Sequence, residues 1–179
     1  MRVDRLADGL WRWTAADADG ADANCVYHEH PDGIVLIDPL LPANPADAER
    51  FWRALDRDVE RIGRPPVVAS TLPDRDAGAH AVAARYAGAR IVVGDGLAAP
   101  GALPGGVEAV PSDPPAAAGR ALLSCVCHGL LWTADLLDDP DTAAALAPGL
   151  AAAAPRVVIA AHGDPVTDDP AGWLARQAG

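Results

Sequence analysis

Four apolar segments of this chain each run into polar residues at their carboxyl end, and this recurrence limits the folds that the chain can adopt. The segments are GIVLID, PPVVAST, LLWTAD and RVVIAAH, and the polar residues are Asp38, Asp74 with Asp76, Asp135 and His162. Short apolar runs bounded by turn signals are typical of buried strands. Ligands gather beyond the carboxyl ends of strands in α/β sheets, so these side chains are expected to converge on one cleft. The alternative for any single aspartate is that it only caps the next helix.

The remaining segments alternate between strand and helix patterns. Residues 9–16 alternate as a strand does, and segments 23–30 and 33–40 flank an Asp32-Gly33 turn that predicts a hairpin. Residues 44–63 have apolar positions at helical spacing and end at a glycine. Further strands are expected within 65–71, 89–96, 105–110, 120–137 and 155–166, and further helices within 77–88, from about 139 onward and within 168–179. The pattern predicts one α/β (α+β layered) domain over residues 1–179.

The charge balance excludes several classes of partner. The chain has 25 acidic and 14 basic residues, a formal net charge of −11, and all of its basic residues are arginines. Nucleic acid and anionic membrane are not expected partners of so acidic a protein. Without a lysine there is no lysine nucleophile and no P-loop lysine. The sequence shows neither a secretory segment nor a membrane span, and its three cysteines read as free thiols, so a cytoplasmic location is expected.

The order of these landmarks resembles the metallo-β-lactamase superfamily, which has the αββα metallohydrolase fold. The resemblance rests on an opening set of strands that carries an Asn and ends in LID, on the strand and loop RPPVVASTLPDRD, on GLLWTADLL and on RVVIAAHGDP. These segments take in nearly the whole chain. The resemblance implies a sandwich of two mixed β-sheets flanked by helices.

The metal-binding loop is where the chain departs from this family. Against the family pattern T-H-x-H-x-D-H, Leu72, Asp74 and Ala77 stand at the three histidine positions, and Asp76 matches the aspartate. Asp135 matches the bridging aspartate of the family, and His162 matches a late histidine. The resemblance therefore implies no dinuclear zinc centre. It leaves either no metal or one divalent ion (Zn, Fe or Mn) held by Asp76, Asp135 and His162.

If no metal is bound, the facing carboxylates of Asp76 and Asp135 oppose each other's ionisation. Either one carboxylate takes up a proton or a cation replaces the metal. Arg75 or another arginine is expected to supply that cation by forming a forked pair with a carboxylate. Asp74, Arg75, His80 and Asp38 are additional candidates for the cleft, although His80 is more readily explained as a residue of a helix surface.

Other histidines and cysteines lie outside this set. His28 and His30 share one face of the predicted hairpin and are expected to face solvent. Cys125 and Cys127 share one face of a predicted strand and are expected to fill space in the core.

Two functions fit these observations. The first is a non-catalytic or strongly diverged member of the fold, which binds a small molecule in the former metal cleft or uses the fold to bind a protein partner. The alternative is a mononuclear metal-dependent hydrolase in which Asp76, Asp135 and His162 hold the ion and a bound water is the nucleophile.

Overall fold

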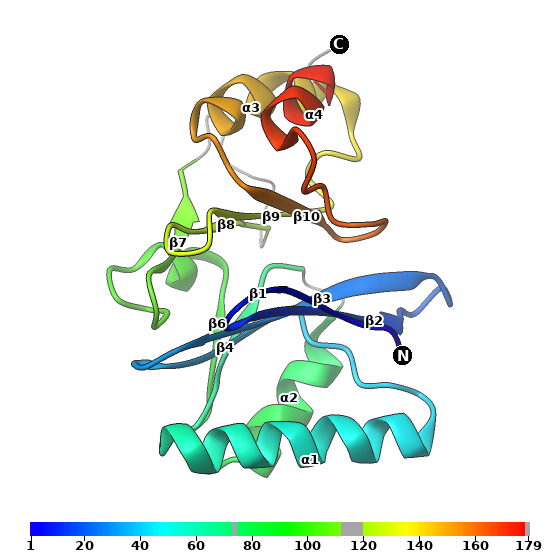
Figure 1. Ribbon diagram of the computed structural model, residues 1–179, viewed down its shortest axis with the longest axis vertical. Coiled ribbons are helices and arrows are strands. Elements are labelled where there is room, and N and C mark those ends of the chain that lie inside the picture. Colours follow the sequence, from blue (N-terminus) through cyan, green and yellow to red (C-terminus); the bar gives the residue numbers. More distant parts are fainter. Residues whose placement is uncertain (73–74, 112–119, 178–179) are drawn as a thin grey trace.

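The computed structural model describes residues 1–72, 75–111 and 120–177, and it contains two β-sheets packed face to face (Figure 1). The first sheet has six strands in the order β1-β2-β3-β4-β5-β6: Val3–Ala7, Leu10–Ala16, Asp22–His30, Gly33–Ile37, Val67–Ser70 and Arg90–Val93. The second has four in the order β10-β9-β8-β7: Val157–Ala160, Leu130–Ala134, Leu122–Cys125 and Val107–Val110. Both sheets are mixed, because β4, β5 and β6 pair in parallel, as do β9 and β10, whereas the other pairs are antiparallel.

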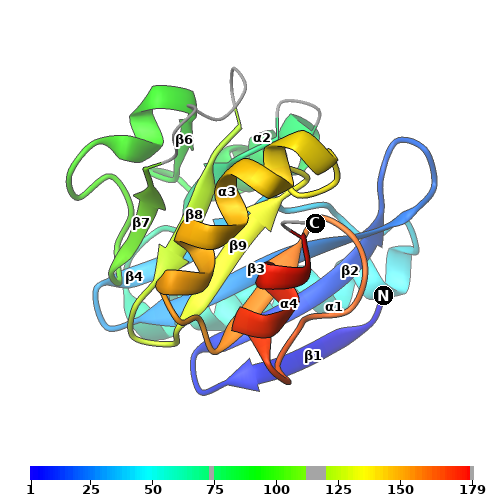
Figure 2. The same ribbon diagram turned by 90° about the horizontal axis from the view of Figure 1, so that it is seen from above.

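Helices cover the outer face of each sheet. Helices α1 (Pro45–Ile62) and α2 (Asp76–Arg85) lie under the six-stranded sheet, and α3 (Pro140–Ala152) and α4 (Pro170–Gln177) lie over the four-stranded one (Figures 1 and 2). A short 3₁₀ helix, η2 (Gly94–Ala98), follows β6. The predicted αββα sandwich of two mixed sheets is confirmed. Among the residues described, no helix is long and apolar enough to span a membrane.

The sheets bury their facing sides in a shared core. Strand β3 shows the alternation that produces this core: Val26 points toward the second sheet, and Cys25 and Tyr27 point toward α1. Trp132 of β9 is fully buried between the sheets. Two further apolar clusters lie beneath α1 and α2 and beneath α3 and α4. The molecule is therefore built in four layers around three apolar interfaces.

Local signals set both ends of α1, and its end at a glycine is the one that the sequence predicts. The Asn44 side chain accepts hydrogen bonds from the amides of Ala46 and Asp47, and Gly63 ends the helix in the left-handed conformation. The β3–β4 hairpin also forms, with His30 paired to Gly33 across the turn.

Two elements differ from the sequence-based expectations. Strand β1 was not predicted; it forms at the sheet edge by pairing with β2. The apolar run within 89–96 is typical of a buried strand, but β6 is the other edge strand, and its residues are half-buried or exposed. An apolar run does not show whether a strand lies in the middle or at the edge of a sheet.

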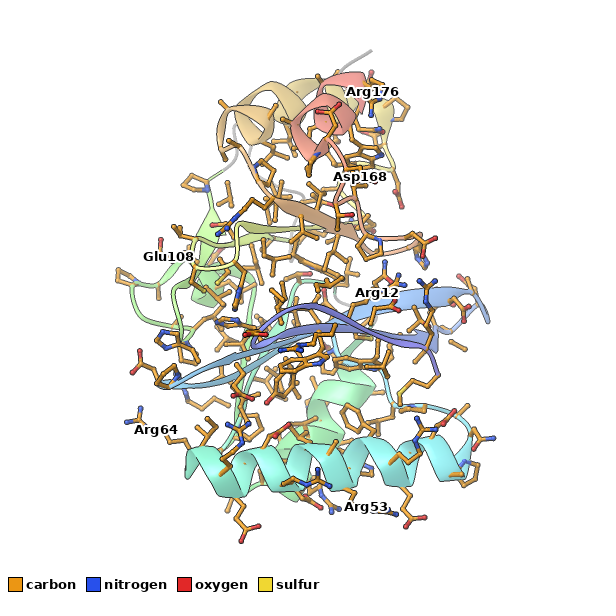
Figure 3. All side chains as sticks on the ribbon, in the orientation of Figure 1. Arg12, Arg53, Arg64, Glu108, Asp168 and Arg176 are labelled. Atoms are coloured by element: carbon orange, nitrogen blue, oxygen red, sulfur yellow. The ribbon has the colours of Figure 1, made fainter. Side chains whose placement is uncertain are left out.

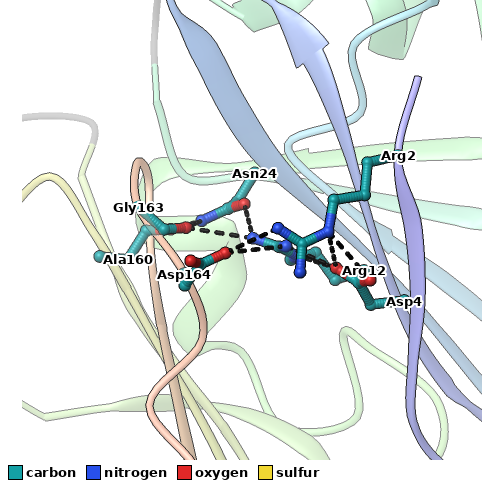
Figure 4. Close-up of polar contacts among 7 residues, drawn as sticks. All are labelled: Arg2, Asp4, Arg12, Asn24, Ala160, Gly163 and Asp164. Carbon is teal, nitrogen blue, oxygen red and sulfur yellow. Dashed lines mark hydrogen bonds and ion pairs between the residues drawn. The ribbon is translucent and has the colours of Figure 1, made fainter.

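A buried arginine joins the two sheets. Arg12 of β2 is 1% exposed and lies between the sheets, whereas Arg53 projects outward from α1 (Figure 3). The Arg12 guanidinium donates to Asn24 Oδ1 (2.9 Å) in the first sheet and to the Gly163 carbonyl (3.1 Å) beyond β10, and it also pairs with Asp4 and Asp164 (Figure 4). We call Arg12 and these four partners the Arg12 network.

Candidate functional site

Asp38 follows the last residue of β4 and is completely buried. Its carboxylate accepts hydrogen bonds from the backbone N–H of Thr71 (2.6 Å) and of Leu72 (3.3 Å) and from the Thr71 hydroxyl. The indole N–H of Trp132 donates to that same hydroxyl oxygen (2.9 Å). Asp38 therefore links the ends of β4 and β5 and, through Thr71, the second sheet.

Strained backbone marks the ends of two strands at this edge. Asp38 has φ 45° and Ala134, which directly precedes Asp135, has φ 52°. Residues other than glycine rarely adopt this left-handed conformation, and such residues cluster at functional sites. The edge of the sandwich that the sequence predicts as a cleft therefore carries backbone strain in both sheets.

Burial of the Asp38 carboxyl raises its pKa to about 6, against the hydrogen bonds of Thr71 and Leu72 and the charge of Arg75, which lower it. A raised pKa means that the folded state keeps its proton where the unfolded state has lost it. The contribution of Asp38 to stability is then fully present below about pH 4 and is lost as the pH rises through about 6.

We therefore expect wild-type protein to lose stability relative to Asp38→Asn between about pH 4 and about pH 6. Urea unfolding of both proteins across this range measures the difference. A difference that stays constant, or one that grows in favour of wild type as the pH rises, would show that hydrogen bonding to the carboxylate outweighs its burial.

Arg75 brings a positive charge into the loop between β5 and α2. Its side chain is buried, with 3% of the residue exposed, and donates to the backbone carbonyl of Asn24 (3.0 Å). Asp76, the first residue of α2, is half-buried and accepts a hydrogen bond from the Ser70 hydroxyl (3.0 Å). His80 lies exposed on α2, and Asp74 lies outside the described residues.

Asp135, directly after β9, is held by an arginine. Arg120 forms a forked pair with both carboxylate oxygens, at 2.8 to 3.1 Å. A guanidinium matches a carboxylate in this bidentate geometry. An arginine in this position is what the hypothesis of a metal-free cleft predicts, although Arg75, the arginine considered first, binds a backbone carbonyl instead.

His162, after β10, contacts the β2–β3 turn. Its Nδ1 lies 3.1 Å from the Asp22 carbonyl oxygen, and its Nε2 lies 3.7 Å from Asp17. Asp138 is a further acidic residue near this pair, which the sequence motifs do not indicate. Burial of Asp138 raises its pKa, the charge of Asp135 raises it further, and His162 lowers it, so the three side chains lie within electrostatic reach of one another. The only indication of Asp138 in the sequence is its position three residues after Asp135.

The ligand atoms of Asp76, Asp135 and His162 are not gathered at metal-binding distances. In residues 1–72, 75–111 and 120–177, one group of three His, Cys, Asp or Glu side chains has its ligand atoms within 4.8 Å of one another, and it is His28, Cys125 and Cys127. The expectation that His28 faces solvent was wrong, because His28 is fully buried between the sheets. The single-metal site at Asp76, Asp135 and His162 stays a prediction.

The fold is shared with known metallo-β-lactamases. A mono-zinc metallo-β-lactamase of the NDM_FIM-1-like type from Erythrobacter litoralis aligns over 99% of this chain and 95% of its own, with a TM-score of 0.65 and 14% identity. A metallo-β-lactamase from Pontibacter korlensis aligns over 99% and 96%, with a TM-score of 0.64 and 17% identity. A fragment of the putative diflavin flavoprotein A 5 from Nostoc sp. PCC 7120 aligns over 99% and 93%, with a TM-score of 0.69 and 14% identity.

No family model and no curated protein matches the sequence. The structural similarity nevertheless spans both sheets and the helices that flank them. This chain therefore has the metallo-β-lactamase fold, as its sequence landmarks predict.

Proposed function

We propose that this protein is a non-hydrolytic member of the metallo-β-lactamase fold that binds a small aromatic molecule. The forked pair of Arg120 with Asp135 supports the lack of hydrolysis. It occupies both oxygens of the carboxylate that would bridge two metals. Arg75 adds a second guanidinium at the same edge, and this one is buried. A cation near these carboxylates repels a divalent metal and also supplies the charge balance that a metal would give.

The pocket between the first sheet and α1 is the candidate ligand site. It has a volume of about 360 Å³, within the range of small-molecule sites. Aromatic rings dominate its lining: Trp11, Trp13, Tyr27 and Phe51. Trp11 meets Tyr27 edge to face at 5.3 Å between ring centroids. Such a lining favours a flat aromatic ligand, and Arg50 and Asp58 offer polar contacts.

Binding of the aromatic probe 1-anilinonaphthalene-8-sulfonate tests the pocket. We expect saturable binding to wild type and at least tenfold weaker binding to Trp11→Ala, because this variant lacks one of the aromatic rings that line the pocket. Trp173→Ala on α4 is the matched control, since this residue packs against the other cluster of the fold. Equal binding by both variants and wild type would refute the pocket as the site.

The second candidate function is a mononuclear metal-dependent hydrolase that uses Asp76, Asp135 and His162. One observation favours it: Asp135 and His162 follow the paired ends of β9 and β10, where Ala160 pairs with Ala134 and the Ala161 amide donates to the Ala134 carbonyl (2.7 Å). A metal ion there would polarise a bound water.

Metal analysis combined with a hydrolysis assay separates the two candidates. Under the first proposal, protein purified without chelator shows no metal-dependent turnover of a chromogenic lactam, a thioester or a phosphodiester. Any metal it carries is then retained in His162→Ala. Turnover together with near-stoichiometric Zn, Fe or Mn, both lost in His162→Ala, would establish the hydrolase instead.

A further inference from the structure

The cluster of His28, Cys125 and Cys127 lies at the end of the strands opposite to the former metal cleft. Cys125 is the last residue of β8 and pairs with Leu130, the first residue of β9. Asp135 follows the last residue of that same strand. The cluster is therefore separated from Asp135 by the full length of β9, and it belongs to a different site.

Three separate segments supply the polar atoms of this cluster. His28 Nε2 lies 3.8 Å from the sulfur of Cys125, and the sulfurs of Cys125 and Cys127 lie 2.8 Å apart. The carbonyl oxygen of Gly105, in the loop before β7, lies 3.2 Å from His28 Nε2 and 3.7 and 3.8 Å from the two sulfurs. The three side-chain ligand atoms lie within 4.8 Å of one another, and the Gly105 carbonyl oxygen lies near all three.

The loop before β7 is shaped around the imidazole. Gly105 has φ +70°, and a Cβ atom at this position would lie 2.5 Å from His28 Nε2. A residue with a side chain would therefore both strain the backbone and collide with the histidine. In addition, His28 Nδ1 is buried without a hydrogen-bond partner in the described residues. A buried histidine beside two thiols is poorly explained as apolar packing.

We propose that His28, Cys125 and Cys127 bind a zinc ion. Two thiolates and one imidazole form a ligand set that favours Zn²⁺ over harder cations such as Mg²⁺ or Ca²⁺. Cys127 is exposed, whereas His28 and Cys125 are buried. An ion can therefore reach the cluster from solvent on the side of Cys127. Each thiol releases its proton to solvent when the ion binds.

Small movements adapt the cluster to the ion. In a tetrahedral site with Zn–S of about 2.3 Å and Zn–N of about 2.0 Å, ligand atoms lie roughly 3.4 to 3.8 Å apart. The distance from His28 Nε2 to the Cys125 sulfur already has this value. The two sulfurs must separate by about 1 Å. The exposed Cys127 side chain can rotate to provide that movement, since it lies in the turn between β8 and β9.

Titration of reduced, metal-free protein with Zn²⁺ and with Co²⁺ tests the proposal. We expect one ion per chain, and Co²⁺ should give the visible absorption of a tetrahedral site and an ultraviolet sulfur-to-metal band. Cys127→Ser should weaken Zn²⁺ binding at least tenfold, because even groups that merely support zinc ligands contribute that much. This variant alters an exposed side chain, so its fold is expected to survive. His28→Asn should have the same effect on the metal, with circular dichroism to check its fold.

Cys25→Ser is the matched control, because this buried thiol lies on the opposite face of β3, where it accepts a hydrogen bond from the Leu40 amide. It should leave zinc binding unchanged, as should His162→Ala. The inference is wrong if the reduced wild-type protein binds no zinc, or if Cys127→Ser binds as tightly as wild type. Zinc that is lost in Cys127→Ser but retained in His162→Ala supports this site and leaves the proposed lack of hydrolysis untouched.

Discussion

Replacing Gly78 with alanine is expected to destabilise the protein by about 3 kcal/mol or more, the upper end of what overpacking usually costs. A Cβ atom at this position would lie 1.8 Å from the carbonyl oxygen of Pro39 and 2.8 Å from its carbonyl carbon. Both atoms belong to the backbone, so neither can rotate away. Either α2 or the segment after β4 would have to move.

Urea unfolding and thermal melting measure this effect. Gly149→Ala in α3 is the matched control, because among the described residues no heavy atom outside the backbone of its own helix lies within 4 Å of the added methyl group. That substitution should be neutral or should stabilise the helix by up to about 1 kcal/mol. If Gly78→Ala unfolds at the same urea concentration as wild type, the close contact between α2 and Pro39 does not exist in solution.

The contact at Gly78 also positions the candidate site. Gly78 is the third residue of α2, two residues after Asp76, and Pro39 directly follows Asp38. The close approach therefore fixes the start of α2, with Arg75 and Asp76, against the strand end that carries Asp38. A variant that folds despite the added methyl group is expected to show altered packing first at this edge.

The sequence predicted this part of the fold well because its signals are local. Apolar runs that end in Asp38, Asp135 and His162 mark strand ends wherever they occur, and the helix stop at Gly63 depends on that residue alone. The order of these landmarks was enough to indicate two mixed sheets between helices. Electrostatics also suggested that Arg75 or another arginine would pair with one of the carboxylates; Asp135 pairs with Arg120, whereas Arg75 binds the Asn24 carbonyl.

The errors arose where distant segments decide the environment of a residue. His28 sits near a hairpin turn, which suggests exposure, yet the loop around Gly105 covers it from 77 positions further along the chain. Similarly, Cys127 was expected on a core-facing strand, but β8 ends at Cys125 and leaves Cys127 exposed in the turn. Periodicity describes one strand at a time and carries no information about what packs over it.

Arg12 is the most consequential of the residues whose environment is decided by a distant segment. It alternates with Trp11 and Trp13, whose side chains line the pocket beside α1, so the strand pattern places Arg12 on the other face. That face would be solvated in a single sheet. Here the second sheet covers it, and the Arg12 network supplies the hydrogen bonds that a buried guanidinium needs.

We expect Arg12→Ala to cost about 3 kcal/mol, because removal of one partner from a buried ionic network leaves the others without compensation. Asn24 Oδ1 would lose its donor, and Asp4 would lose the guanidinium that lowers the pKa of its carboxyl. Arg12→Met keeps much of the side-chain volume and tests whether packing alone accounts for the loss. Because the polar partners stay unpaired, it should restore little of the stability in urea unfolding.

Asp164→Ala separates the buried part of the network from its exposed part. The Asp164 side chain is 76% exposed, so its removal should change stability by less than about 1 kcal/mol. If Asp164→Ala and Arg12→Ala lower the free energy of unfolding equally, the buried contacts of Arg12 do not contribute more than the exposed one. Hydrogen exchange adds a local readout, since the Asn24 amide donates to the Ala161 carbonyl (2.7 Å) beside the network. Faster exchange at Asn24 in Arg12→Ala would show that this arginine holds the two sheets together at the edge that carries His162.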